Sequence, residues 1–488
     1  MFKPTVDEAK PFLKDYKVIP VCKEIFADIK TSVEVLRNFM AQNKKCYLLE
    51  SVETTRHWGR YCFLGYDPRK TIRCNDGVVS IQEDGKIWRQ KTENPNEVLR
   101  KILAEYKSPR LDFLPPFTGG LVGYFSYDYV KYTQKTLNLE NDNSQNFDDF
   151  KLMLFDKVIA FDNIKQKIFI IVNVPAENFE VEYENAKKEI EKIQKFLEMP
   201  VTKEVFCSKI KSEFKMLYDK QTFEKMVEKI KHYIYEGDIF QAVISNRLEA
   251  DFEGHLLQAY RFLRTLNPSP YMFYLNFGDM EIAGASPETL AALRNRQLTS
   301  YALAGTCPAG KTIEEDNALT DALLKDEKEL AEHNMLVDLA RNDLGKVSEF
   351  GSVKVVEYKK ILKFAYVSHL ASMVCAKLQK GFDALDALEA VLPAGTLSGA
   401  PKKRACEIIN ELEKHKRGVY GGAVGYIDFA GNMDTCIAIR IIVLQNEKIY
   451  VQAGAGVVAD SKPEKEFEEC VHKAKASLKA VYCAQEEK

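Results

Sequence analysis

Short apolar segments rich in β-branched and aromatic residues recur through the first half of the chain and predict β-strands. The clearest are residues 45–51 (KCYLLES), 119–127 (GGLVGYFSY) and 167–174 (KIFIIVNV). The polar stretch 134–149 predicts an exposed loop. Residues 177–198 combine Glu and Lys with apolar residues at helical spacing, which predicts an amphipathic helix.

The pattern changes at a connector over residues 201–215. We place the main boundary there, between an N-terminal region (1–215) and a C-terminal region (216–488). The second region opens with a predicted helix at 223–235 and a strand at 237–247.

Further along, the periodicity predicts one long helix over residues 318–344 and a final helix over 462–481. Strands are expected at 421–428, 435–444 and 448–453. Because strands and helices do not alternate strictly, the pattern favours an α+β fold with large antiparallel sheets over a doubly wound one.

Composition excludes several classes of protein. Lys+Arg total 69 against 71 Asp+Glu, with no long charged block, which argues against nucleic acid or a membrane surface as partner. The 11 cysteines lie far apart without a C-x-x-C pair, which favours reduced thiols over disulfides or a zinc ribbon. With no signal core and no run of about eighteen apolar residues, the sequence predicts a cytoplasmic enzyme.

Two helical segments carry carboxylates on one face. In residues 326–345, Glu329 and Glu332 lie within little more than one turn of each other, beside His333. Neighbouring carboxylates repel, and a hard divalent cation or a basic side chain can compensate. Taken alone, the spacing is better explained by a solvated acidic face.

The last helix repeats this arrangement. Glu466, Glu469 and Lys473 fall at i, i+3 and i+7 within PEKEFEECVHKA. Each helix alone is typical of a surface helix with ordinary ion pairs. The two faces could also meet across a site and share one Mg²⁺ with substrate oxygens.

Two segments of small residues predict turns that could hold an anion on backbone N–H groups. The first is 392–405 (LPAGTLSGAPKKRA), which contains Thr396 and leads into a helix, and the second is 452–461, with Gly454 and Gly456. Neither has the spacing of a P-loop or a full dinucleotide fingerprint, so nucleotide binding is not favoured.

Six motifs occur in a fixed order: AGTCPAGKTIEED, DEKELAEHNMLVDLARNDLG, PAGTLSGAPK, CIAIR, AGAGVVADS and PEKEFEE. Together they resemble the chorismate-utilising enzymes, and among them anthranilate synthase component I, from about residue 30 to about residue 478. The resemblance implies antiparallel sheets packed as a sandwich with helices on the outside, with the chorismate site in the region 216–488.

The resemblance also implies a metal site. Glu332 and Glu469 would bind Mg²⁺ directly, while Glu329 and Glu466 would bind it through metal-bound water. Lys473 would balance their charge. The resemblance also implies a catalytic role for Glu329.

Substrate contacts follow in the same way. Arg440, Tyr420 and the amides near Gly454 and Gly456 would hold the carboxylate of the enolpyruvyl side chain of chorismate. Thr396 would line the site from the first small-residue turn.

The implied reaction converts chorismate and ammonia to anthranilate and pyruvate, the first committed step of tryptophan biosynthesis. Ammonia adds at C2 while the C4 hydroxyl leaves, and that departure needs a general acid. Glu288 matches the family's glutamate that protonates this hydroxyl, and His369 matches its active-site histidine.

Two positions favour anthranilate synthase over its relatives. Isochorismate and salicylate synthases carry a lysine where this chain has Gln241, and aminodeoxychorismate synthases carry one where it has Ala304. An aminodeoxychorismate synthase component I without its lysine, and an inactive tryptophan-binding relative, remain alternatives. Cys307 and Ala309 replace two arginines that the family usually has.

Ammonia delivery and regulation complete the prediction. The sequence has no G-x-C-x-G elbow of a glutaminase, so a separate glutamine amidotransferase small subunit is expected, in a heterotetramer. Two segments, LLES and NPSPYMFY, resemble the feedback pocket for L-tryptophan. The residues expected in it are Glu50, Ser51, Asn267, Pro270, Tyr271 and Met272, with Cys436 adjoining.

Overall fold

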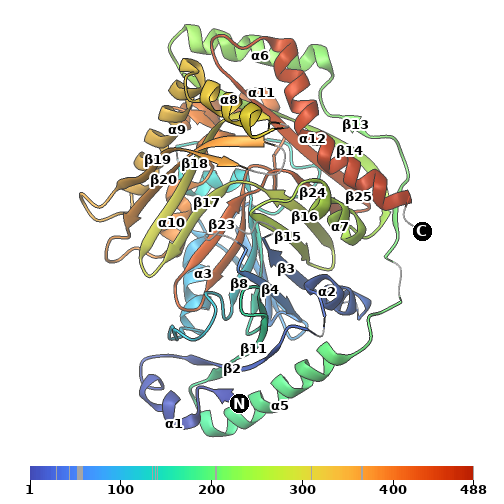
Figure 1. Ribbon diagram of the computed structural model, residues 1–488, viewed down its shortest axis with the longest axis vertical. Helices are drawn as coiled ribbons and strands as arrows, with labels where there is room; N and C mark the ends of the chain where they lie inside the picture. The colour runs from blue at the N-terminus through green and yellow to red at the C-terminus, as the bar shows by residue number, and fades with distance from the viewer. Residues whose placement is uncertain are drawn as a thin grey trace.

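A computed structural model describes residues 1–28, 30–42, 44–51, 59–134, 136–137, 139, 141–203, 206–308, 310, 312–363 and 367–486. The described chain forms two large β-sheets, and every ladder between named strands is antiparallel. Helices pack outside them (Figure 1). The predicted α+β fold with antiparallel sheets is confirmed.

Within the described residues, the larger sheet has 14 strands. Its order is β1 (Phe2–Lys3), β2 (Val18–Phe26), β11 (Lys167–Pro175), β10 (Lys157–Asp162), β4 (Tyr61–Tyr66), β3 (Cys46–Glu50) and β15 (Tyr271–Asn276). It continues through β16 (Met280–Ser286), β24 (Ile441–Gln445), β25 (Lys448–Val457), β14 (Gln241–Gly254) and β12 (Ser208–Ile210). The short strands β13 (Lys215–Met216) and β21 (Gly399–Ala400) also pair with β14.

The second sheet has 11 strands in the described part of the chain. It begins with β19 (Lys354–Lys363), β20 (Val367–Lys377), β18 (Gln297–Pro308), β17 (Thr289–Arg294) and β23 (Met433–Ile437). It ends with β22 (Ala423–Asp428), β8 (Gly120–Phe125), β9 (Phe150–Phe155), β5 (Lys70–Asn75), β6 (Val78–Glu83) and β7 (Lys86–Lys91). One hydrophobic core contains buried residues from both sheets, which therefore pack against each other.

The helices cover the outer faces of these sheets. They are α1 (Val6–Ala9), α2 (Ser32–Ala41), α3 (Pro95–Ala104), α4 (Val130–Thr133), α5 (Phe179–Glu198), α6 (Lys220–Tyr235), α7 (Leu257–Leu266), α8 (Ile313–Leu323), α9 (Glu327–Gly345), α10 (Ala384–Val391), α11 (Lys402–Glu413) and α12 (Pro463–Glu486). Helix α12 packs on β25, α6 and α7, whereas α9 packs on β18 and β20 (Figure 1). No helix in the described ranges is long and apolar enough to cross a membrane.

Strands from both predicted regions pair within each sheet. In the larger sheet β3 lies beside β15, and in the smaller one β8 lies beside β22. The division near residue 215 stays a prediction, but the regions on its two sides are joined through both sheets.

The chain passes from one sheet to the other at two places that matter for the site. The first lies at 287–288, between β16 of the larger sheet and β17 of the smaller. The second lies at 438–440, between β23 and β24. The prediction of one strand over 435–444 is therefore wrong: β23 ends at Ile437, β24 begins at Ile441 in the other sheet, and Arg440 between them adopts a left-handed conformation (φ 53°).

Two other predictions are corrected. The single long helix over 318–344 is two helices, α8 and α9, because the Asp326 side chain accepts the N–H groups of Lys328 and Glu329 and starts a new helix. The loop over 134–149 is not exposed throughout, since Phe147 and the two aspartates that follow it are buried.

The close pairing of β8 and β22 generates a test of the shared sheets. A Cβ on Gly120 would lie 2.2 Å from the carbonyl oxygen of Ile427, which the ladder holds in place. We expect Gly120→Ala to destabilise the protein by about 1–3 kcal/mol, as overpacking does, and to lower the midpoint of thermal unfolding. Gly345→Ala, which meets no atom within 4 Å, is the control and should not lower it. Equal midpoints for both variants would contradict this account.

Candidate active site

One cavity of about 630 Å³ lies between α9, α12 and the ends of several strands. All the side chains and glycines predicted for catalysis, substrate and metal line it. They are Glu288, Glu329, Glu332, His369, Thr396, Tyr420, Arg440, Gly454, Gly456, Glu466, Glu469 and Lys473. The sequence therefore predicted a set that the fold brings together, although their roles stay predictions.

Glu288 and Arg440 owe their positions to the two passages between the sheets. Backbone bonds tie these passages together: the Ile437 N–H donates to the Glu288 carbonyl (3.0 Å), and the Ala285 N–H donates to the Arg440 carbonyl (3.2 Å). Neither residue belongs to a strand, so both side chains line the cavity.

Burial shifts the pKa values of these two side chains in the directions expected for charged groups removed from water. It raises the pKa of Glu288, against the hydrogen bond from Thr396 and the nearby charges of Lys473 and Arg440. It lowers the pKa of Arg440, which Glu288 and Tyr420 oppose. A carboxyl with a raised pKa holds its proton longer and can act as a general acid.

The first small-residue segment forms the predicted turn, a short 3₁₀ helix at Gly395–Leu397. From it the Thr396 hydroxyl donates to Glu288 Oε2 at 3.1 Å. The Ser398 hydroxyl instead donates to the Ala394 carbonyl at 2.8 Å, within the turn.

The second small-residue segment forms a turn only at its end, at 458–461, which corrects the prediction for its two glycines. Gly454 and Gly456 lie within β25 and pair with β14, so the ladder continues where a turn was expected. A Cβ on Gly454 would lie 2.9 Å from the Tyr420 hydroxyl, and one on Gly456 would lie 2.7 Å from Gln241 Nε2. The glycines leave room for those side chains in the cavity wall.

His369 lies on β20 beside an irregularity of β18. The register between these strands shifts at Gly305, which has a left-handed φ of 79°. Burial lowers the pKa of His369, a hydrogen bond to the Gly305 backbone opposes this, and Arg440 lowers it further. The imidazole is therefore neutral near pH 7 and able to accept a proton.

Four carboxylates from α9 and α12 share the cavity. Burial raises the pKa of Glu329, Glu332 and Glu466, and the charge of Glu469 raises each of them further. Lys473 Nζ lies 2.6 Å from Glu469 Oε1 and also donates to the Gly454 carbonyl (3.2 Å). Lys328 lowers the pKa of Glu329, Glu332 and Glu466, and Lys473 lowers that of the last two, so these two lysines offset part of the negative charge of the two helices.

These carboxylates fit a magnesium ion by their chemistry. Hard oxygen donors are the ligands that Mg²⁺ prefers, and it commonly takes only one or two protein carboxylates together with water and substrate. Glu466 Oε2 is buried without a hydrogen-bond partner in the described residues. No three such ligands already converge in the described part of the chain, so the remaining positions would fall to water and substrate.

A second cavity, of about 540 Å³, is lined by most of the residues that were predicted to bind L-tryptophan. Those that line it are Glu50, Ser51, Pro270, Tyr271 and Met272, with Cys436 in its wall as expected. Asn267 lines the first cavity instead, and Pro270 lines both. The two cavities therefore share a wall.

A hydrogen bond joins this second cavity to the residue next to Glu288 of the first. The Tyr271 hydroxyl lies 2.9 Å from Thr289 Oγ1 and donates to Asp434 Oδ1 at 2.9 Å, and Asp434 also binds Arg294. Thr289 directly follows Glu288. This contact could not be predicted, because it joins residues far apart in sequence.

Several cavity residues were not predicted. Lys328, Gln452 and Ser461 line the first cavity. Lys328 and Ser461 lie inside motifs, and Gln452 directly precedes one, so their neighbourhood was the only signal in the sequence. Cys307 and Ala309 stand where the resemblance led us to expect arginines. Cys307 is buried in a small cluster with leucines from α8 and β20, and Ala309 lies outside the described residues.

The site combines a buried acid, an arginine, a neutral histidine and paired carboxylates, which defines an enzyme for a small anionic substrate. The chain belongs to the family of chorismate binding enzymes, whose pattern matches residues 44–479. It is 44% identical to "Anthranilate synthase component 1" of Acetivibrio thermocellus over 99% of both chains. It is 42% identical to the protein of that name from Aquifex aeolicus, over 99% of this chain and 98% of the other.

Solved structures agree. The crystal structure of anthranilate synthase component I from Streptococcus pneumoniae TIGR4 matches with a TM-score of 0.75 and 36% identity, covering 93% of this chain and 98% of that one. The menaquinone-specific isochorismate synthase of Escherichia coli shares the fold, with a TM-score of 0.69 at 18% identity over 97% of this chain and 98% of the other.

The contact between Thr396 and Glu288 yields a prediction about pH. The hydroxyl stabilises the Glu288 carboxylate, so Thr396→Val should raise the pKa of Glu288 further. If turnover needs the protonated acid, activity is lost as pH rises through that pKa, and the variant should keep activity to higher pH. The test is kcat against pH at constant free ammonia. Ser398→Ala is the control, and an unmoved alkaline limb in Thr396→Val would contradict the assignment.

Proposed function

We propose that this chain is the chorismate-converting component of an anthranilate synthase, which makes anthranilate and pyruvate from chorismate and ammonia. The single observation that supports this best is that all the residues predicted for the reaction line one cavity. The similarity to anthranilate synthase component 1 over nearly the whole chain supports the same choice.

Glu288 is the proposed general acid. It reaches the cavity from a passage between sheets, and burial favours its protonated form. It gives its proton to the C4 hydroxyl of chorismate as that group leaves and ammonia adds at C2. Loss of the C2 proton and of pyruvate then makes the ring aromatic, and the neutral His369 is available to hold a proton during these steps.

Arg440 and Tyr420 are the proposed partners of the enolpyruvyl carboxylate. Both line the cavity, and the Tyr420 hydroxyl lies so near Gly454 that a Cβ there would meet it at 2.9 Å. Burial destabilises the Arg440 cation, so an anionic substrate would relieve that cost.

Mg²⁺ is the proposed cofactor, held by Glu332 and Glu469, with Glu329 and Glu466 acting through metal-bound water. When bound, it would supply a Lewis acid and template for the ring carboxylate of chorismate. The four carboxylates would gain the positive charge that Lys328 and Lys473 only partly supply.

Ammonia would come from a separate glutamine amidotransferase subunit. Gln241 and Ala304, the residues where related enzymes carry lysines, both line the cavity, which disfavours water activation or covalent capture by a lysine at these two positions. An aminodeoxychorismate synthase remains the second candidate, and an inactive tryptophan-binding protein the third.

The direct test is product analysis. With chorismate, Mg²⁺ and ammonium salts, the purified chain should form anthranilate, recognised by its fluorescence, and the rate should rise with pH at low ammonium as more free ammonia becomes available. Glutamine alone should not support turnover. Aminodeoxychorismate as product would favour the second candidate, and no turnover under any condition would favour the third.

The metal assignment can be tested with one variant in each of the two acidic helices and one control variant. Glu332→Gln and Glu469→Gln keep the size of the side chain but remove its charge, so turnover at ordinary Mg²⁺ should be lost while the fold persists. Glu468→Gln, an exposed neighbour on α12, is the control and should stay active. Activity near wild type in both cavity variants would refute the assignment.

We also propose that L-tryptophan inhibits the enzyme from the second cavity. The Ser51 hydroxyl is buried without a partner in the described residues, so it can donate to a ligand carboxylate. Glu50 is buried beside it, paired with Arg264 at 2.6 Å and bonded by the Tyr260 hydroxyl at 2.5 Å. The Glu50 carboxylate would bind the ammonium group of the ligand in addition to Arg264.

The shared wall gives the inhibitor a physical route to the active site. Pro270 borders both cavities, and Tyr271 reaches Thr289 next to Glu288. A ligand that shifts this strand changes the substrate cavity without occupying it. Coupling of about 1–3 kcal/mol would change chorismate affinity roughly 5- to 150-fold.

Ser51→Phe should fill the slot and relieve inhibition, with turnover largely unchanged when tryptophan is absent. Ser51→Ala removes only the hydroxyl and should keep most of the inhibition. The measurement is the rate against tryptophan concentration. A wild-type rate unaffected by millimolar tryptophan would remove the regulatory proposal, whereas a fully sensitive Ser51→Phe would place the inhibitor elsewhere.

A further inference from the structure

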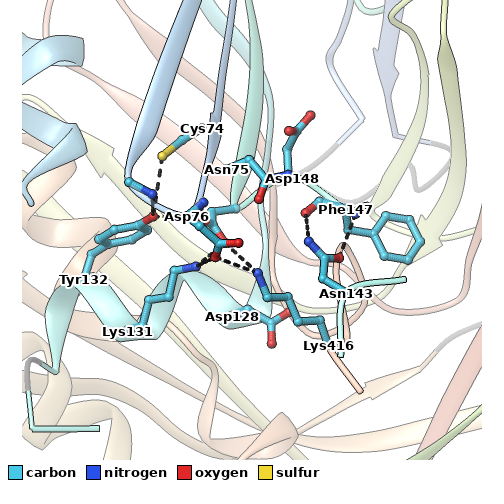
Figure 2. A network of polar contacts seen from close by, with 12 residues as sticks. Cys74, Asn75, Asp76, Asp128, Lys131, Tyr132, Asn143, Phe147, Asp148 and Lys416 are labelled. Atoms are coloured by element: carbon cyan, nitrogen blue, oxygen red, sulfur yellow. Dashed lines mark hydrogen bonds and ion pairs between the residues drawn. The ribbon is translucent and has the colours of Figure 1, made fainter. Parts of the chain in front are cut away.

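Residues 414–418 begin the link from α11 to β22 and lie between the N-terminal region and the cavity wall. Figure 2 shows the side that faces the N-terminal region, where the Lys416 ammonium lies 2.9 Å from Asp76 Oδ1. Lys416 also lies 3.8 Å from buried Asp149, and Lys131 binds both aspartates.

The backbone of this segment is fixed as well. The Gly418 N–H donates to Asp128 Oδ2 at 2.9 Å, and its carbonyl accepts the Tyr127 N–H at 3.0 Å. The contacts of Lys416 and Gly418 on its two sides therefore fix the backbone from which the Arg417 side chain extends.

Arg417 is almost fully buried and reaches the other way, toward the cavity wall. Its guanidinium donates to the carbonyls of Leu397 and Val243, both at 2.6 Å. It also forms a bidentate pair with Glu413, at 2.8 Å and 2.6 Å, and its Cζ lies 4.3 Å from the centre of the Tyr127 ring.

Glu413 extends these contacts to a third part of the wall. Its Oε1 accepts both the N–H (2.7 Å) and the hydroxyl (3.0 Å) of Ser245, and the Ser245 hydroxyl accepts Gln452 Nε2 at 2.8 Å. Leu397, Val243 and Gln452 all line the first cavity, but Arg417 itself does not.

We propose that Arg417 is a positioning residue for the reaction of the first cavity, a role that rests on the proposed function. It fixes the Gly395–Leu397 turn, which carries Thr396, against β14 and β25. Arg417 makes four hydrogen bonds from three nitrogen atoms, whereas a lysine ammonium has three donors on one nitrogen, so lysine cannot make all of them.

Arg417→Lys is the first test, by steady-state kinetics with chorismate, Mg²⁺ and ammonium at a temperature where the variant is folded. Displaced wall groups bind substrate less well and align it less well, so KM for chorismate should rise and kcat should fall. The expected loss in kcat/KM is roughly 100-fold. A purely structural role would lower only the amount of active protein, which leaves KM unchanged.

Arg100→Lys is the matched control, because Arg100 binds Asp383 and Asp386 between α3 and α10 and does not line the cavity. Its KM should stay at the wild-type value. If Arg417→Lys does not fold, Tyr127→Leu removes the ring beneath the guanidinium and should raise KM to a smaller degree.

An unchanged KM in Arg417→Lys, or in Tyr127→Leu where only that variant folds, would overturn the positioning role while leaving the proposed function intact. A wild-type chain that does not convert chorismate would overturn both.

Discussion

The passage of the chain from one antiparallel sheet to the other is the constraint on which the site depends. A residue inside a ladder has its direction set by the pleat, whereas one at a passage is free to point into the space beside the sheets. Glu288 and Arg440 stand at two such passages, and backbone hydrogen bonds between the passages fix their separation. The acid and the cation of the cavity are thus placed by the architecture that builds the core.

Electrostatics then makes this arrangement responsive to ligands. Burial in the cavity raises the pKa of three glutamates from α9 and α12 and lowers that of Arg440. The charged forms of these acidic and basic side chains are therefore both destabilised by burial. A hard cation and a dicarboxylate substrate complement these charges together better than either does alone. The same architecture places a second cavity across the wall at Pro270, which lines both.

The sequence predicts the long periodic elements well, because hydrophobic spacing alone defines α5, α6 and α12. It fails where tertiary structure decides. Residues 435–444 look like one strand but divide between two sheets at Arg440, and the cap at Asp326 is hidden in a helical pattern. The motifs identified the cavity residues through resemblance, whereas Arg417 could not be found, since its role exists only through carbonyls that the fold brings to it.

The central claim is that the facing acidic helices and the substrate hold one metal ion jointly. Titration calorimetry of Mg²⁺ into the chain, with and without saturating chorismate and with no ammonia source, tests it most directly. The account predicts one Mg²⁺ per chain, bound more tightly when chorismate is present, and loss of that enhancement in Glu332→Gln and Glu469→Gln. The same Mg²⁺ affinity with and without chorismate would contradict it.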